Sequence, residues 1–379
     1  MADYSNEALD LHRRMKGKIH IELNDKLQSL DKLKLYYTPG VAAVSKAVAL
    51  HKEKLREYTW TGNNVAVISD GSAVLGLGNI GPEGAMPVME GKCLLFKHFA
   101  NIDAVPIILN VHSANDIINT VKAIAPSFGG INLEDIAAPL CFEIEAKLAQ
   151  QLPIPVFHDD QHGTAIVTLA GLINATKLTK RKLDACRVTI VGSGAAGVAI
   201  AKLLSLYAPG ISIIMVDSKG IISNNRRDLN PSKQGLLAFT NKDNISGALI
   251  DALAGSDIFI GVSSPGLLTA SMIKSMNNNP IIFAMANPEP EIDPDTAHRA
   301  GASIVATGRS DYPNQINNAL VFPGVFRGAL DNSVRHITDE HKLKAAEVVA
   351  NLMDRPDYDH IVPSIGDVRL VPSIAKVIC

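Results

Sequence analysis

The chain has 379 residues, of which 47% are hydrophobic and 20% charged, and its formal net charge is −2. This length exceeds what one hydrophobic core usually supports, so we expect about two domains. The nearly balanced charge gives no electrostatic reason to expect a nucleic-acid or membrane-surface partner, which leaves small-molecule chemistry as the default.

The cysteines and the N-terminal residues indicate the compartment. No C-x-x-C pair is present, which favours reduced, buried thiols; the cysteines are Cys93, Cys141, Cys186 and Cys379. The segment Met1–Arg14 is charged and lacks the apolar core of a secretion signal, and no run is long enough to span a membrane. We therefore expect a cytoplasmic protein.

The first half of the chain predicts helices followed by a parallel sheet. Residues 1–60 are charged and helix-like until the turn Tyr36–Gly40 breaks the pattern. From residue 64 short apolar runs alternate with helical stretches, which is typical of βαβ units. The expected strands are 64–69, 104–110, 130–133 and 154–157, and the expected helices are 84–99, 114–125 and 141–150.

A buried connecting helix, 163–178, precedes a second α/β region. We place the domain boundary here, with a substrate and metal domain at 1–162 and a nucleotide-binding domain at 163–379. The second domain is expected to contain strands at 187–191, 211–216, 257–262, 281–285 and 303–306, and helices at 195–206 and 345–353.

A glycine-rich turn follows the first strand of the second domain. It runs Gly192, Ser193, Gly194, Ala195, Ala196, Gly197, and Asp217 ends the next strand. Strand, turn, helix, strand and a terminal acid in this order predict a Rossmann unit, in which the backbone approaches a pyrophosphate at a helix N-terminus. The sequence therefore predicts binding of NAD or NADP.

Two adjacent pairs of acids end short apolar runs in the first domain, Glu134-Asp135 and Asp159-Asp160. One such pair alone is most often a solvated loop. Two pairs that converge at the carboxyl ends of parallel strands would repel each other, and a divalent cation that prefers oxygen ligands, Mg²⁺ or Mn²⁺, would relieve this. We expect a metal site; His158 and His162, which flank the second pair, are better assigned as supporting polar residues.

Other polar residues have both a structural and a functional interpretation. Lys92 stands in an apolar helix, where a surface lysine is the simpler interpretation; beside a divalent cation its pKa would fall, which would make it a general base. Tyr36 and Tyr37 on the Thr-Pro-Gly turn favour packing, although a phenol can donate a proton to carbon. Asn287, Asn317 and Asn318 either cap turns or bind a substrate carboxylate.

Taken together, the motifs resemble malic enzymes of the short bacterial form, and the resemblance runs through nearly the whole chain. The segments that carry it are Tyr37–Val41, Leu75–Gly81, Glu90–Lys92, Asn132–Asp135, Phe157–Ala165, Val191–Gly197, Ala286–Pro288 and Asn317–Gly324.

The resemblance implies residue roles and a reaction. It implies oxidative decarboxylation of L-malate to pyruvate and CO₂ with reduction of NAD(P)⁺, in a homodimer or larger homo-oligomer where Tyr37 can serve a neighbour's site. The implied metal ligands are Glu134, Asp135 and Asp160; Lys92 is the general base, Tyr37 the general acid and Asp159 the partner of the lysine; Asn287, Asn317 and Asn318 hold the substrate, and Thr164 and Asn287 contact the cofactor.

Some features leave alternatives open. Longer members of the family carry an arginine after the Asp-Gly turn, whereas Asp70-Gly71 is followed here by Ser72. Asp217 favours NAD because it would accept a hydrogen bond from the ribose, yet NADP stays possible because cations that could meet a 2′-phosphate follow, namely Lys219, Arg226 and Arg227. Competing functions are a malolactic enzyme, an amino-acid dehydrogenase, which would not need the acidic strand ends, and a non-catalytic NAD(H) sensor.

Overall fold

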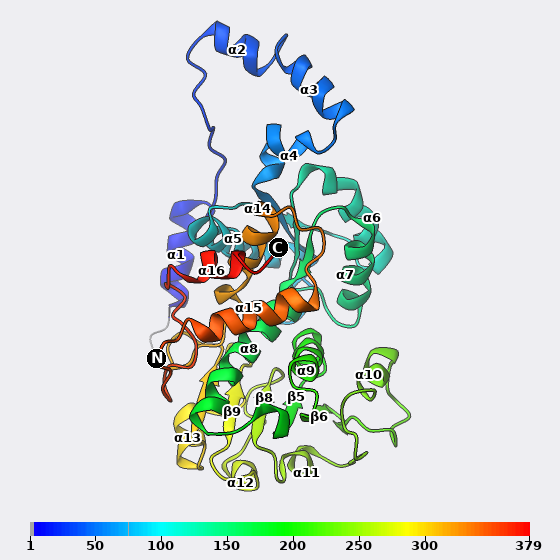
Figure 1. Ribbon diagram of the computed structural model, residues 1–379, viewed down its shortest axis with the longest axis vertical. Helices are drawn as coiled ribbons and strands as arrows, with labels where there is room; N and C mark the ends of the chain where they lie inside the picture. Colours follow the sequence, from blue (N-terminus) through cyan, green and yellow to red (C-terminus); the bar gives the residue numbers. More distant parts are fainter. Residues whose placement is uncertain (1–3, 75) are drawn as a thin grey trace.

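The computed structural model describes residues 4–74 and 76–379 and contains two sheets covered by helices (Figure 1). One sheet has four strands in the order β2-β1-β3-β4, and the other has six in the order β10-β9-β8-β5-β6-β7. The predicted α/β fold with a Rossmann-type second sheet is confirmed. Met1–Asp3 and Leu75, the first residue of the Leu75–Gly81 motif, lie outside the described residues.

The first sheet is parallel throughout, and its strands fall within a few residues of the predicted ranges. Its strands are β1 (Asn64–Ser69), β2 (Asp103–Ile108), β3 (Ile131–Leu133) and β4 (Val156–His158), and its helices are α5 (Gly81–Ala100), α6 (Ala114–Ile124), η2 (Ala125–Ser127) and α7 (Leu140–Gln151). Because parallel strands share one carboxyl edge, the acids that follow β1, β3 and β4 meet there.

The second sheet is parallel except for the short edge strand β7. Its strands are β5 (Arg187–Val191), β6 (Ser212–Asp217), β7 (Gly220–Ile221), β8 (Ile258–Gly261), β9 (Ile281–Ala284) and β10 (Ile304–Thr307). The chain order reverses between β5 and β8, and this switch point is where an open α/β sheet binds its ligand.

Helices surround the second sheet on both faces (Figure 1). The helices that follow α8 in the chain are η3 (Leu183–Ala185), α9 (Ala195–Tyr207), α10 (Pro231–Leu236), α11 (Leu249–Leu253), α12 (Ala270–Lys274), α13 (Pro294–Arg299), η4 (Asn318–Leu320), α14 (Phe322–Asp331), α15 (Asp339–Asn351) and α16 (Leu370–Ala375). Of these, α14 and α16 pack back toward the first sheet, so the C-terminal part of the chain covers both halves.

One long helix, α8 (Asp159–Leu178), follows β4 of the first sheet without a loop and leads to the second sheet through a short connection. It begins earlier than the predicted range 163–178, directly after β4, so that Asp159 and Asp160 occupy its first turn. Acidic side chains are favoured there because the helix N-terminus carries partial positive charge. Most of α8 is buried, and it packs on α9 and α15 within a core that includes residues of both sheets.

The N-terminal helices are far more exposed than the rest. They are α1 (Ser5–Met15), α2 (Leu30–Tyr36), α3 (Val41–Leu50), α4 (Lys54–Tyr58) and η1 (Trp60–Gly62). Helices α2 and α3 extend away from the body of the molecule (Figure 1). This arm, residues 29–50, exposes apolar side chains that an isolated chain leaves in water, among them Leu30, Leu35, Val41 and Val44.

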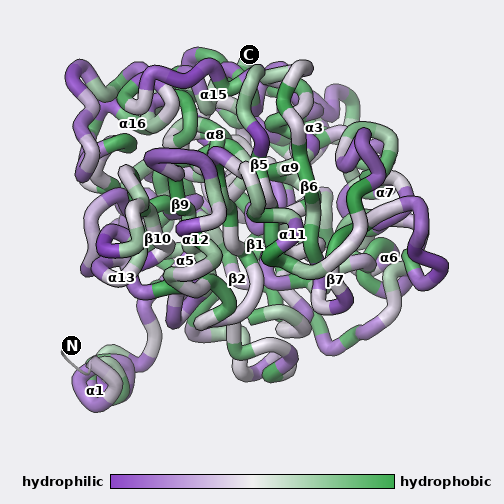
Figure 2. Tube along the Cα trace, turned by 90° about the horizontal axis from the view of Figure 1, so that it is seen from below, coloured by the Kyte–Doolittle hydropathy of each residue, from purple (hydrophilic) through white to green (hydrophobic). Residues whose placement is uncertain are grey.

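Hydrophobic positions lie along inner segments such as β5 and β6, while hydrophilic positions lie on outer turns (Figure 2). Cys93, Cys141 and Cys186 are buried free thiols, as predicted, whereas Cys379 is exposed. Among residues 4–74 and 76–379, no helix is long and apolar enough to cross a membrane.

Candidate active site

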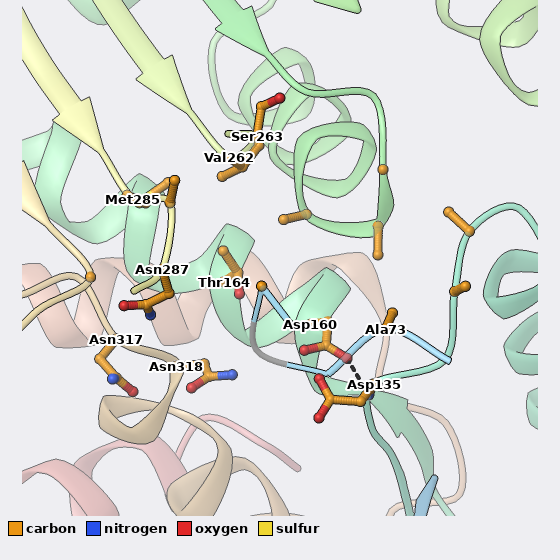
Figure 3. Close-up of a pocket in the computed structure, with 18 of the residues that line it drawn as sticks. Ala73, Asp135, Asp160, Thr164, Val262, Ser263, Met285, Asn287, Asn317 and Asn318 are labelled. Carbon is orange, nitrogen blue, oxygen red and sulfur yellow. Dashed lines mark hydrogen bonds between the residues drawn. The ribbon is translucent and has the colours of Figure 1, made fainter. Parts of the chain in front are cut away.

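Three acidic side chains meet where β3 ends and α8 begins. Glu134, Asp135 and Asp160 each offer a carboxylate oxygen, and these oxygens all lie within 4.8 Å of one another. The backbone N–H of Asp135 donates to Oδ2 of Asp160 over 2.7 Å, which ties the two chain segments together. Asp135 and Asp160 face the same cavity (Figure 3). We call Glu134, Asp135 and Asp160 the carboxylate cluster.

Lys92 lies beside the carboxylate cluster and is only 7% exposed. Its Nζ donates to Oε1 of Glu134 over 2.7 Å and also to Oδ2 of Asp159. The same ammonium lies 4.2 Å from the ring centroid of Phe322, a favourable cation–π distance. The simpler interpretation of Lys92 as a surface lysine is therefore wrong.

Burial and mutual repulsion raise the pKa values of three of these acids. Burial, together with the charge of Glu134, raises the pKa of Asp159 to about 8 despite the attraction of Lys92. Burial likewise raises the pKa of Glu134 and of Asp160. Burial alone would lower the pKa of Lys92, but attraction to Asp159 and Glu134 outweighs it, so this pKa is raised. This raised pKa belongs to the protein chain alone, whereas the lowering expected from the sequence concerns a site that holds a divalent cation.

The donor set suits a hard divalent cation. Two acids, Glu134 and Asp159, pair with the one ammonium, and Asp135 and Asp160 lie next to Glu134, so ionising all four carboxyl groups would leave excess negative charge in a buried region. Among the described residues, the buried Oδ1 of Asp159 has no hydrogen-bond partner. Oxygen ligands in this number and at this spacing match Mg²⁺ or Mn²⁺.

Glu145 on α7 organises the turn between β4 and α8. Its Oε1 accepts the backbone N–H of His158 over 2.9 Å, and its Oε2 lies 3.0 Å from Nε2 of Gln161 and 2.8 Å from Nε2 of His162. His162 is thus engaged by Glu145 rather than by the carboxylate cluster. His158 is buried, with Nε2 3.8 Å from Oδ2 of Asp160.

Gly163 permits the close packing of this turn. A Cβ atom at this position would lie 1.8 Å from Oδ1 of Asp159 and 3.0 Å from Cβ of Asn318. No other amino acid fits without displacing the aspartate. The glycine therefore fixes how closely α8 and the Asn317–Asn318 segment approach each other.

A cavity of about 490 Å³ opens in front of the carboxylate cluster and extends to the second sheet (Figure 3). Asp135 and Asp160 line one side, and Asn287, Asn317 and Asn318 line another. The Oδ1 of Asn317 also accepts the N–H of Ala319 over 2.8 Å, so the predicted capping role applies to this residue. The remaining predicted residues that line the cavity are Thr164, Gly194, Ala195 and Ala196.

The glycine-rich turn has the geometry of a nucleotide loop. Gly192 adopts a φ of +113°, and a Cβ on Gly197 would lie 1.9 Å from the carbonyl oxygen of Gly192. Ser193 lies between them, and α9 begins two residues later at Ala195. The turn thus brings unpaired backbone N–H groups of α9 to the cavity, where they favour an anion.

Asp217, at the end of β6, is held by two cations. Its Oδ1 lies 2.7 Å from Nη1 of Arg226, and its Oδ2 lies 2.6 Å from Nζ of Lys233. Despite partial burial, which raises it, the pKa of Asp217 is lowered by these contacts. Of the cations named from sequence, Lys219 instead pairs with Asp228, and Arg227 is exposed.

Tyr37 is the one predicted catalytic residue that the structure does not bring to the others. It ends α2 on the extended arm and is 66% exposed. Neither the carboxylate cluster nor the cavity in front of it includes this residue. Within a single chain, Tyr37 follows α2 on the arm whereas Lys92 lies on α5, and Figure 1 shows α2 far from α5.

Sequence reasoning missed several residues of the site. Glu145 lies on the buried face of α7 together with Cys141, Ile144 and Leu148, and an acid at that spacing is a recognisable signal. The fully buried Glu291 accepts the N–H groups of Ser263 and Ala286, which both line the cavity. These contacts join distant segments, and local sequence gives no sign of them.

Comparisons with known proteins agree with this arrangement. Residues 15–116 match the family model "Malic enzyme, N-terminal domain", and residues 161–378 match "Malic enzyme, NAD binding domain". A bifunctional malic/malolactic enzyme of Bacillus subtilis is 52% identical over 98% of this chain and 91% of its own length. An NADP-dependent malic enzyme of Halomonas elongata is 45% identical over 98% of this chain and 92% of its own length. The crystal structure of an NAD-dependent malic enzyme from Thermotoga maritima superposes with a TM-score of 0.95 at 48% identity, covering 100% of this chain and 99% of that one.

Proposed function

The chain belongs to the malic enzyme family, and from this premise we propose that it oxidatively decarboxylates L-malate to pyruvate and CO₂ with reduction of NAD(P)⁺. The observation that carries the proposal is the buried Lys92, held between Glu134 and Asp159 beside three converging carboxylates. An acid–base group next to a cation site and facing a nucleotide loop is what this reaction requires.

Each residue has a role that follows from its contacts. Glu134, Asp135 and Asp160 would hold a divalent cation, and Asn287 and Asn318 would bind the substrate carboxylates across the cavity. When bound, the cation supplies Lewis-acid stabilisation at the substrate oxygens, and the nicotinamide accepts the C2 hydride. Thr164 and the backbone of the glycine turn would contact the cofactor.

Lys92 and Tyr37 would move the protons. Neutral Lys92 takes the C2 hydroxyl proton as hydride leaves C2, and Asp159 holds the resulting ammonium. The bond between C3 and the departing carboxyl carbon then breaks, and Tyr37 donates a proton to C3. A cation that draws charge from Glu134 would weaken the attraction that keeps Lys92 protonated.

A homodimer would bring Tyr37 to the reaction. The exposed apolar side chains of the arm support this proposal, because they need a partner surface and because Tyr37 lies on the same arm. In such a dimer the arm of one subunit reaches the carboxylate cluster of the other.

Subunit mixing tests the dimer. Lys92→Ala and Tyr37→Phe homodimers are each expected to have little activity. After co-refolding, mixed dimers contain one site with both native residues if Tyr37 acts in trans, giving about a quarter of wild-type activity. No recovery, with mixed dimers demonstrated by two affinity tags, would place Tyr37 in its own subunit's site or outside catalysis.

The reaction itself is tested by product identity. The protein is mixed with L-malate and Mn²⁺, NAD or NADP is supplied separately, and cofactor reduction, pyruvate and lactate are all measured. Reduction with pyruvate supports the proposal. Lactate without net reduction would indicate malolactic activity, a second candidate favoured by the bifunctional Bacillus relative. NAD binding without turnover would indicate a sensor.

Three finer assignments belong to the same proposal. We favour NAD over NADP because Asp217 ends β6 at the place where a ribose hydroxyl would be bound. We also keep a domain boundary between residues 162 and 163 and a cytoplasmic location. The second domain's family match, which starts at residue 161, supports the boundary.

A further inference from the structure

A second cavity, of about 440 Å³, lies between α7, α8, α9 and α15. It shares no lining residue with the cavity in front of the carboxylate cluster or with the hollow around Asp217. Helix α8 separates the two cavities, since Asp160 and Thr164 face the first while Gln161 and Ala165 face the second. Figure 1 shows α7, α9 and α15 meeting where the halves of the molecule join. We call this space the rear cavity.

The lining of the rear cavity combines apolar walls with surplus cations. Phe142, Ala146 and Leu206 contribute to the walls. Lys202 and Lys342 share the carboxylate of Asp339, each with Nζ 3.0 Å from one of its oxygens. Two further residues, Arg335 and His336, are exposed and have no hydrogen-bond or ion-pair partner in the described part of the chain. An unpaired guanidinium beside an apolar wall fits an organic anion.

Glu145, one of the two acids that line the rear cavity, is hydrogen-bonded within the protein. Its carboxylate already engages the His158 N–H, Gln161 and His162. Attraction to His162 and hydrogen bonds to both histidines hold the pKa of Glu145 down to about 2, although burial alone would raise it. The cations that line the cavity still outnumber the two acids; they are Lys202, Arg335 and Lys342.

The partners of Glu145, Gln161 and His162, link the rear cavity to the proposed reaction site. Gln161 and His162 line the rear cavity, and they directly follow Asp159 and Asp160 in the first turns of α8. Any occupant that displaces Gln161 or His162 therefore shifts the turn that carries Asp160 of the carboxylate cluster.

We propose that the rear cavity is an effector site for a small organic anion with an apolar body, and that its occupation changes cation binding at the carboxylate cluster. Pockets of this volume accommodate small metabolites. The coupling rests on the proposed metal site, whereas binding of the anion does not.

Binding is tested with 8-anilinonaphthalene-1-sulfonate, a fluorescent anion with an apolar body, in the presence of saturating NAD, which keeps the cofactor site filled. Arg335→Glu should weaken probe binding about tenfold or more, as expected for the loss of a charged contact. Ala146→Trp, which fills the cavity from an exposed position, should weaken binding similarly. Arg299→Glu, on the exposed face of α13, is the matched control and should leave it unchanged.

The coupling is tested by Mn²⁺ titration followed by electron paramagnetic resonance, with and without the probe. A change of at least about threefold in Mn²⁺ affinity, absent in Arg335→Glu, is expected. Probe binding that is absent under NAD, or equal in wild type, Arg335→Glu and folded Ala146→Trp, overturns the site. Equal Mn²⁺ affinity with and without bound probe overturns the coupling. Because probe binding needs neither malate nor turnover, an inactive protein that binds the probe would refute only the proposed reaction.

Discussion

Two charge clusters in this protein have opposite compositions and opposite environments. Around Lys92, one cation meets Glu134 and Asp159 in the interior; around Asp217, one acid meets Arg226 and Lys233 near the surface. The interior cluster is surrounded by further acids and has raised carboxyl pKa values, whereas the pKa of Asp217 is lowered. The comparison teaches that similar ion pairs favour different ligands: the acids around Lys92 lack positive charge and favour a cation, whereas the cations around Asp217 are in excess and favour an anion.

The largest effect is expected when the buried cation, Lys92, is removed. Lys92→Ala should lower kcat by about 10³-fold, because among residues 4–74 and 76–379 no other amine pairs with the carboxylate cluster to accept the hydroxyl proton. NAD affinity should persist, since Lys92 does not line the cavity that includes the nucleotide loop. Steady-state kinetics and NAD titration check both expectations.

Lys97→Ala is the matched control for that experiment. Lys97 stands on the same helix, is 55% exposed and pairs with Asp103, so its removal should leave kcat unchanged. A kcat near the wild-type value in Lys92→Ala would remove Lys92 from the mechanism.

The lack of positive charge around the carboxylate cluster can be measured as its affinity for Mn²⁺. Asp135→Asn should weaken Mn²⁺ binding by about tenfold or more, because one of three converging oxygens loses its charge. Asp217→Asn, in the cluster with excess positive charge, should leave Mn²⁺ affinity unaltered. Isothermal titration calorimetry without substrate gives both values; equal losses in the two variants would contradict the assignment of the metal site.

The smallest expected effect concerns the choice between NAD and NADP at Asp217 and the cations that pair with it. Asp217→Ser frees Lys233 and leaves Asp228 as the only acid paired with Arg226 in the described part of the chain, so the ratio of kcat/KM for NADP to that for NAD should rise by about tenfold. The two kcat/KM values, measured at saturating malate, give the ratio. An unchanged ratio would mean that Asp217 is not at the adenosine ribose.

The backbone plan was accessible from sequence because its signals are local. Apolar runs of strand length between helical stretches predicted β1 to β6 and β8 to β10 closely, except for the early start of α8. The convergence of Glu134 with Asp160 also followed, because parallel strands end at one edge.

The burial of single charged side chains was harder to predict, although the spacing of apolar residues in α5 indicates that Lys92 is buried. Lys92 occupies the same face of α5 as Ala85, Met89 and Phe96, a spacing that points inward. What local pattern cannot supply is the partner, since Glu134 and Asp159 lie on other elements. The pairing of Asp217 with Lys233 and the separation of Tyr37 from Lys92 depend on tertiary arrangement in the same way.

The unbroken passage from β4 into α8 has a consequence for building chimaeras. Helix α8 is 20 residues long and about 30 Å from end to end. It is a continuous helix that connects the two sheets. Gly163 of α8 packs against Asn318. If one half of the protein is exchanged for that of a relative, the new half must therefore preserve this contact with the other half. Recombination between relatives should therefore tolerate crossovers in exposed turns, such as 242–243, far better than crossovers inside α8.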